Sequence, residues 1–141
     1  MDYKLELVVV PVSDVDRAKA FYLDQCGFDL IVDHSAGDFR VVQLEPHGSK
    51  CAIAMMPNSP NQMEPGSLHG LHLVVTDIAA AYAELSGKGV DAGEPFRYSE
   101  AGTPEPGVDP NHTDYATFFT FHDPDGNTWL VQEVGWAAVQ A

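Results

Sequence analysis

Two polar residues, His72 and Gln132, stand inside otherwise apolar runs of the sequence. An imidazole can act as a general base for isomerisation or cyclisation, and an amide can hold a ligand through hydrogen bonds. The alternative is that both side chains satisfy neighbouring backbone groups. One histidine is weak evidence for catalysis. We therefore interpret the pair as polar anchors of a pocket, with His72 as the catalytic residue if the protein is an enzyme.

Other reactive side chains offer less support for catalysis. The sequence has no Gly-x-Ser-x-Gly motif for a serine nucleophile and no glycine-rich phosphate loop. Cys26 lies at the end of a predicted helix, and Cys51 is expected to point toward the helices. The remaining histidines fall near predicted turns, strand ends or an insertion, and we expect them at the surface: His34, His47, His69, His112 and His122.

The composition predicts one acidic globular domain. The chain has 141 residues, 45% of them hydrophobic, which suits one core and is too little for two ordinary domains. With 21 acidic and 7 basic residues, the net charge of −14 disfavours nucleic acid and anionic membranes as partners. No apolar run reaches the roughly 18 residues of a membrane span. Two cysteines without C-x-x-C spacing, and no signal-peptide pattern, favour a reduced, cytoplasmic setting.

The element that must position Gln132 is a predicted β-hairpin. Its turn is Asp123-Pro124-Asp125-Gly126-Asn127, in which proline presets one turn φ and glycine tolerates a positive φ. The flanking residues 118–122 and 129–134 are aromatic and β-branched, as in strands. We interpret the aromatic residues near this turn as core or dimer interface rather than a stacking platform: Phe118, Phe119, Phe121, Trp129 and Trp136.

The same succession of elements is predicted twice. Residues 12–15 (Val-Ser-Asp-Val) match residues 75–78 (Val-Thr-Asp-Ile), and each match opens a predicted helix that ends at a glycine, Gly27 or Gly89. The predicted strands are residues 5–12, 28–34, 39–44 and 51–56 in the first half, and 71–76, an extended piece from Val90, 118–122 and 129–134 in the second. The repeat predicts an α+β fold of two β-α-β-β-β modules.

We expect these modules to form a single domain over residues 1–141. Module 1 covers about residues 3–57, a proline-rich linker covers 58–67, and module 2 covers about 68–135. Module 2 contains an insertion at 98–114, rich in glycine, proline and polar residues, which has no counterpart in module 1. Such a segment is either a functional lid or disordered, and the sequence leaves both open.

The two modules, the stretch 12–28 (Val-Ser-Asp-Val-Asp-Arg-Ala-Lys-Ala-Phe-Tyr to Cys-Gly-Phe) and the Asp-Pro-Asp-Gly-Asn turn resemble the vicinal oxygen chelate superfamily. This superfamily contains glyoxalase I, extradiol dioxygenases, fosfomycin-resistance enzymes and bleomycin-resistance proteins. The resemblance covers residues 5–134. It implies a curved mixed sheet with a concave ligand cavity, and commonly a homodimer. One scaffold carries several chemistries, so it implies the fold more strongly than the function.

Enzymes of this superfamily hold a divalent metal at four positions, one in the first strand and one in the last strand of each module. The matching residues are Leu7, Ala52, Gly70 and Leu130. None of these side chains can bind a metal, whereas a metal site requires oxygen or imidazole ligands. The resemblance implies a divalent metal, and the departure at all four positions argues against a metal cofactor in this protein. A relocated metal would need His72, Gln132 and a third ligand, such as His112 from the insertion, because Glu133 should face away from the pocket.

The leading hypothesis is a metal-independent binding protein of the bleomycin-resistance type, which sequesters an apolar or aromatic compound. Cationic compounds belong to this ligand class. Its small-molecule pocket would be lined by Leu7, Val9, Ala52, Ala54, Met56, His72, Leu130 and Gln132 and closed by part of residues 98–114. The alternative is a glyoxalase-like lyase or isomerase, or a dioxygenase, with a relocated metal or with His72 as acid or base. A third possibility is a degenerate interaction module whose pocket is filled by its own side chains.

Overall fold

The structure, a computed structural model, describes residues 1–60 and 62–140. The chain divides into two compact units, each with its own mixed sheet. Unit 1 comprises residues 1–68 and 123–127, and unit 2 comprises residues 69–122 and 128–141. The order of helices and strands confirms the α+β class and the repeated β-α-β-β-β plan. Within the described residues, no helix is both long and apolar enough to cross a membrane.

Unit 1 is built on a sheet of four strands in the order β1-β4-β3-β2. Its elements are β1 (Leu7–Val9), α1 (Val15–Ala20), the π-helical turn η1 (Phe21–Gln25), β2 (Asp29–Ala36), β3 (Phe39–Glu45) and β4 (Ala52–Met55). The predicted first strand, residues 5–12, was too long. β1 pairs in parallel with β4, which is only four residues long. Backbone bonds to Glu6 and Val10 extend this pairing by one residue at each end, so the short partner limits the strand.

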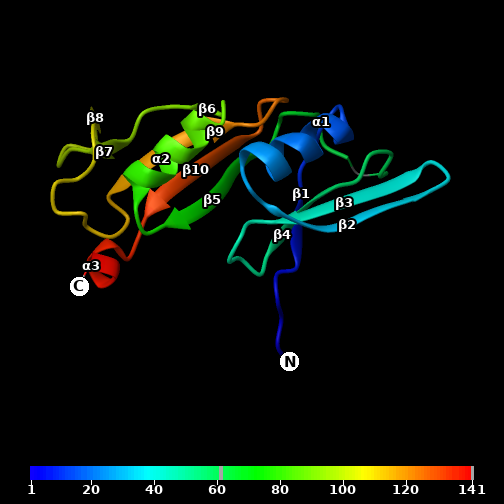
Figure 1. The fold of residues 1–141 in the computed structure, drawn as a ribbon, viewed down its shortest axis with the longest axis horizontal. Helices are drawn as coiled ribbons and strands as arrows, with labels where there is room; N and C mark the ends of the chain where they lie inside the picture. The colour runs from blue at the N-terminus through cyan, green and yellow to red at the C-terminus, as the bar shows by residue number, and fades with distance from the viewer. Residues whose placement is uncertain (61, 141) are drawn as a thin grey trace. The chain divides into compact units, whose positions relative to one another are not determined.

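The helix of unit 1 begins as predicted. The Asp14 side chain accepts the backbone N–H of Arg17 and caps α1, and Gly27 follows the helical segment with a φ of +74°. Figure 1 shows α1 lying over β3, where Val42 and Leu44 are fully buried. Apolar residues from the helical segment and this face of the sheet form the core: Val15, Ala18, Phe21, Tyr22, Val42, Leu44, Ile53 and Met55.

The predicted hairpin turn is confirmed, and its residues 123–127 are grouped with unit 1. Asp123 is 5% exposed and accepts hydrogen bonds from the Tyr22 hydroxyl at 2.8 Å, from the Asn127 side chain at 2.7 Å and from two backbone N–H groups of the turn. The Asn127 amide also donates to the carbonyl of Pro11. The turn residues therefore close the hairpin and also bind the segment before α1.

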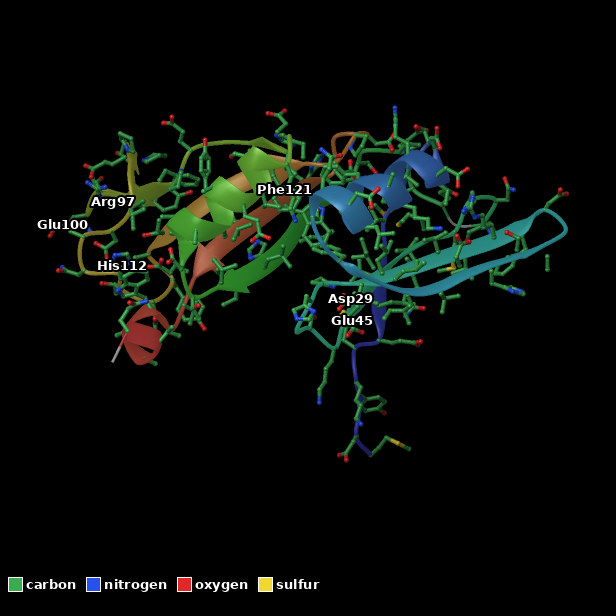
Figure 2. All side chains as sticks on the ribbon, in the orientation of Figure 1. Asp29, Glu45, Arg97, Glu100, His112 and Phe121 are labelled. Carbon is green, nitrogen blue, oxygen red and sulfur yellow. The ribbon has the colours of Figure 1, made fainter. Side chains whose placement is uncertain are left out.

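Unit 2 contains a sheet of six strands in the order β5-β10-β9-β7-β8, with β6 paired to β9. Its elements are β5 (His69–Val75), α2 (Ile78–Gly87), β6 (Asp91–Ala92), β7 (Phe96–Tyr98), β8 (Pro104–Pro106), β9 (Thr117–His122), β10 (Thr128–Glu133) and α3 (Trp136–Gln140). Asp77 caps α2 by accepting the N–H of Ala80. In Figure 1, α2 lies across β9 and β10, and Phe121 is labelled beside it in Figure 2.

Alternation along the hairpin decides which aromatic residues enter the core. Phe119, Phe121 and Trp129 are almost fully buried and face α2, with the Phe121 and Trp129 rings stacked at 5.7 Å. This confirms their assignment to the core. Phe118 has the opposite parity on β9 and is only half-buried. Trp136 lies in α3, where its ring stacks on His112.

The insertion 98–114 is not irregular throughout. Residues 104–106 form β8, which pairs with β7, and the turn between them is closed by the bond from Ser99 N–H to the Thr103 carbonyl. Arg97 donates to the carbonyl of Pro106 at 2.9 Å. Beyond β8, the Asp109 carboxylate accepts the N–H of Thr113. The prediction missed this hairpin because two of the three residues of β8 are prolines, which are rare in strands other than edge strands such as β8.

Candidate functional site

The candidate site is the face of the unit 2 sheet that points away from α2, called here the distal face. Trp129, Val131 and Glu133 of β10 are buried toward α2, so Leu130 and Gln132 point the other way. Their cross-strand neighbours on β5 and β9 share this orientation, and His72 is exposed. The alternation predicted for His72, Leu130 and Gln132 therefore brings all three to one surface.

Two rows of side chains cross the middle of the distal face. In one row, Leu130 lies between His72 on β5 and Thr120 on β9. In the next, Gln132 lies between Val74 and Phe118. His72 and Gln132 are thus one pleat apart on neighbouring strands, with Leu130 beside His72 and with Val74 and Phe118 beside Gln132. This matches the expected pattern of a few polar groups among apolar walls.

Three aromatic rings extend the Gln132 row toward the insertion. Phe96 on β7 is the cross-strand partner of Phe118, and Tyr98 lies two residues further along β7. The three ring centroids are 5.6 to 5.8 Å apart, in tilted and edge-on arrangements. Tyr98 is 55% exposed. The cluster, named here the aromatic trio, offers a surface on which another planar ring can pack.

The predicted pocket residues of module 1 also share one face, in unit 1. Leu7 lies opposite Ala52 and Val9 opposite Ala54, on the side of the sheet that points away from the buried core residues Val42 and Leu44. Gln43 is the cross-strand partner of Ala54 and adds an amide to this face. Met56 follows the end of β4 and is half-buried. The two groups of predicted residues belong to separate units.

The donor chemistry at the superfamily's metal positions does not fit a metal. Leu7, Ala52, Gly70 and Leu130 carry no nitrogen or oxygen in their side chains. Among the described residues, no three His, Cys, Asp or Glu side chains come together as a group able to hold an ion. His112, the suggested third ligand, instead lies 2.7 Å from the buried Glu133 carboxylate.

The electrostatics of unit 2 disfavour an anionic ligand. Its sequence contains two basic residues, Lys88 and Arg97. Lys88 pairs with Glu84, and Arg97 pairs with Glu105 while donating to backbone carbonyls of the insertion. The pKa of Asp109, in the same insertion, is held below its ordinary value by the hydrogen bonds from Thr113. Unit 2 therefore carries the negative charge of Asp109, and both of its basic side chains are already paired with carboxylates.

The comparisons with known proteins agree with this fold. Residues 4–131 match the model of the Glyoxalase/Bleomycin resistance protein/Dioxygenase superfamily. The chain belongs to this superfamily. Among solved structures of the superfamily's fold, it is similar to TnmS3, an antibiotic binding protein from Streptomyces sp. CB03234, with 32% identity, a TM-score of 0.73, and coverage of 94% of this chain and 96% of that one.

Two further relatives extend the similarity. A glyoxalase/bleomycin resistance protein from Streptomyces sp. CB03234 shares 32% identity and a TM-score of 0.70, over 92% of this chain and 100% of that one. YetH of Bacillus subtilis (strain 168) is 27% identical over 128 residues, which are 89% of this chain and 94% of YetH. The predicted resemblance to the superfamily is thereby confirmed.

Sequence reasoning missed the aromatic trio. Phe118 was grouped with the core aromatics, and Phe96 and Tyr98 were not singled out. The available signal was the alternation of side chains along a strand. Phe118 and Gln132 each directly neighbour a buried residue, Phe119 or Val131, and so point to the opposite face. The cross-strand pairing of Phe96 with Phe118 required the course of the insertion, which carries no hydrophobic periodicity.

Proposed function

We propose that the protein binds a planar aromatic or otherwise apolar small molecule, without a metal, on a site that includes the distal face. The observation that carries this proposal is the aromatic trio beside Gln132, on the same surface as His72 and Leu130. A planar ligand can pack on the rings, and the amide and imidazole can fix its polar edge. The similarity to an antibiotic binding protein supports an antibiotic or a similar compound as the ligand.

The charge distribution supports neutral and cationic compounds over anions. The net charge is −14, and both basic residues of unit 2 are already paired. Part of residues 98–114, in the same unit as the distal face, would close the site, and the face of unit 1 that carries Leu7, Val9, Ala52, Ala54 and Met56 is proposed as a ligand-binding surface of that unit. We also propose a homodimer and a reduced, cytoplasmic setting, in which the thiols of Cys26 and Cys51 remain reduced.

The test is a thermal-shift and fluorescence titration with bleomycin and polycyclic aromatic antibiotics. A ligand that binds only the folded protein raises its stability by RT ln(1 + [L]/Kd). We expect the double variant F118A/Y98A to weaken binding by about tenfold or more, since each aromatic contact contributes about 1 kcal/mol. Tyr3→Ala, which removes a 91% exposed ring outside the site, is the matched control. Unchanged affinity in the double variant would remove the trio from the site.

The second candidate function is an enzyme that uses His72 as acid or base. His72 is exposed and lies opposite Leu130, so a substrate on the distal face could reach its ring. Turnover that depends on pH and is lost in His72→Ala would favour this function. Elemental mass spectrometry of protein purified without a histidine tag supplies a further check, since one divalent metal per subunit would contradict the metal-independent proposal.

A further inference from the structure

The Gln132 row of the distal face continues onto the edge strand β8. Gln132 on β10 lies opposite Val74 on β5 and Phe118 on β9. Phe96 on β7 is the partner of Phe118, and Pro106 on β8 is the partner of Phe96. The row thus crosses the five strands β5, β10, β9, β7 and β8. Neighbouring strands are about 4.8 Å apart, so the row is about 19 Å long.

The row that contains His72 is shorter. It covers β5, β10 and β9 with the side chains of His72, Leu130 and Thr120. Beyond β9, the carbonyl of Thr120 accepts the N–H of Gly93, which has no side chain to continue the row. A flat apolar compound therefore has a longer support along the Gln132 row, across the strands, than along the His72 row.

The far end of the Gln132 row depends on a hairpin with few backbone donors. β7 and β8 have three residues each, and short hairpins are marginally stable. Pro104 and Pro106 are two of the three residues of β8, and proline has no backbone N–H. The pairing of β7 with β8 therefore has fewer backbone hydrogen bonds than an ordinary hairpin of this length.

The Arg97 side chain supplies further hydrogen bonds to this hairpin, near which Figure 2 labels it. Its Nη1 donates to the carbonyl of Pro106 at 2.9 Å and to that of Val108 at 3.5 Å. Its Nε lies 3.7 Å from the Glu105 carboxylate. Gly107 makes room for the guanidinium, because a β-carbon there would lie 3.1 Å from Nη1. Arg97 lies between two rings of the aromatic trio in β7, so its side chain holds β8 from the opposite face.

We propose that Arg97 is a positioning residue that sets the length of the bound compound by holding Pro106 at the end of the Gln132 row. This proposal rests on the proposed function, because the aromatic trio forms the middle of the same row. The ligand class is an elongated, rigid, conjugated molecule that lies across the strands, with its polar group over Gln132 and an apolar end on β8. A short aromatic compound on Gln132 and Phe118 does not reach β8 and does not depend on Arg97.

The test uses diphenylpolyenes, which lengthen with each double bond and gain no polar group: trans-stilbene, 1,4-diphenylbutadiene and 1,6-diphenylhexatriene. Wild type should bind diphenylhexatriene more tightly than stilbene in fluorescence titrations. Arg97→Ala should reduce the ratio of the two dissociation constants by about fivefold, since one ring contact contributes about 1 kcal/mol. The affinity for stilbene should stay unchanged.

Two further variants separate positioning from charge. Gly107→Ala should lower the ratio in the same direction, because its methyl group would crowd the guanidinium and its φ of +101° favours glycine. Lys88→Ala is the matched control, since Lys88 is the other basic residue of unit 2 and also pairs with a glutamate. It removes the same charge and should leave the ratio unchanged.

The outcomes distinguish this proposal from the proposed function. An equal loss of affinity for all three polyenes in Arg97→Ala, or an unchanged ratio, would overturn length selection and leave aromatic binding standing. Failure of all three polyenes to bind wild type would overturn aromatic binding on the distal face, and length selection with it. Polyenes that bind Phe118→Ala as tightly as wild type would have the same consequence, because Phe118 lies in the middle of the row.

Discussion

The Nδ1 atom of His112 lies 2.7 Å from Oε1 of Glu133, a carboxylate that is only 1% exposed. The other oxygen of Glu133 accepts the backbone N–H of Ile78 at the start of α2. The His112 ring also stacks on Trp136 of α3 at 3.8 Å (Figure 2 labels His112 near this helix). One buried carboxylate thus connects the insertion, the last strand and two helices of unit 2.

Replacing His112 by alanine should lower the free energy of unfolding by about 1 to 3 kcal/mol, since a buried carboxylate oxygen would lose its partner. Hydrogen exchange should increase in residues 109–114 and in α3. His47→Ala is the control, because the His47 pair with Asp29 is exposed, at 87% and 56% of the two side chains, and should change stability by less than about 0.5 kcal/mol. Equal effects of the two substitutions would contradict the role of Glu133.

A second prediction concerns the hydroxyl of Tyr22, which donates to the buried Asp123 at 2.8 Å. Tyr22→Phe keeps the ring, which stacks on Phe28, and removes only this hydrogen bond. We expect a loss of about 1 to 2 kcal/mol in urea unfolding, because Asp123 is a carboxylate with little access to water. Tyr82→Phe, on α2, provides the matched control with an expected change within about 0.5 kcal/mol. A neutral Tyr22→Phe variant would show that the turn does not depend on this contact.

A third prediction separates two adjacent phenylalanines of β9. Phe119 is 0% exposed and faces α2, so Phe119→Ala should cost about 3 to 5 kcal/mol. Phe118 is half-buried on the distal face, so Phe118→Ala should cost only about 1 to 2 kcal/mol. Chemical denaturation of both variants measures the difference. Reversed values would mean that the strand presents the opposite face to α2.

Much of this fold could be predicted from local chemistry. Asp14 and Asp77 cap their helices as expected, and the Asp-Pro-Asp-Gly-Asn turn closes its hairpin. Parity alone placed Leu130, Gln132 and His72 on one face. The position of His69 could not be found this way, because a single bulge at Gly70 reverses the alternation before it.

Other features depended on contacts between distant residues. The Pro-Glu-Pro sequence of residues 104–106 does not indicate a strand. These residues form one because they pair with β7, a contact that the local sequence does not encode. Glu133 was correctly expected to face away from His72 and Gln132, yet its partner His112 lies in a segment without periodicity. The sequence therefore predicted which way the side chains of a strand point. It did not predict which loop residues contact them.

The last prediction is a pH dependence that originates in unit 1. The Arg40 guanidinium and the Lys19 ammonium bind Asp33, at 3.2 and 2.7 Å, and hold the pKa of its carboxyl below the ordinary value of 3.8. A lowered folded-state pKa contributes stability that is complete above the unfolded-state pKa and is lost as the pH falls through the folded-state value. The contribution of Asp33 should therefore be constant at neutral pH and decline below a pH of 3.8.

Asp33→Asn tests this prediction through the difference in urea midpoint from wild type. The variant should be less stable at neutral pH, and the difference should shrink as the pH falls below 3.8, because protonated Asp33 loses the same ion pairs that the variant lacks. Asp2→Asn, at the exposed N-terminal end of the chain, should show no such convergence. A difference in urea midpoint that stays constant down to acidic pH would contradict the prediction. It would mean that Asp33 stabilises the fold equally well when its carboxyl is protonated, and therefore not through its charge.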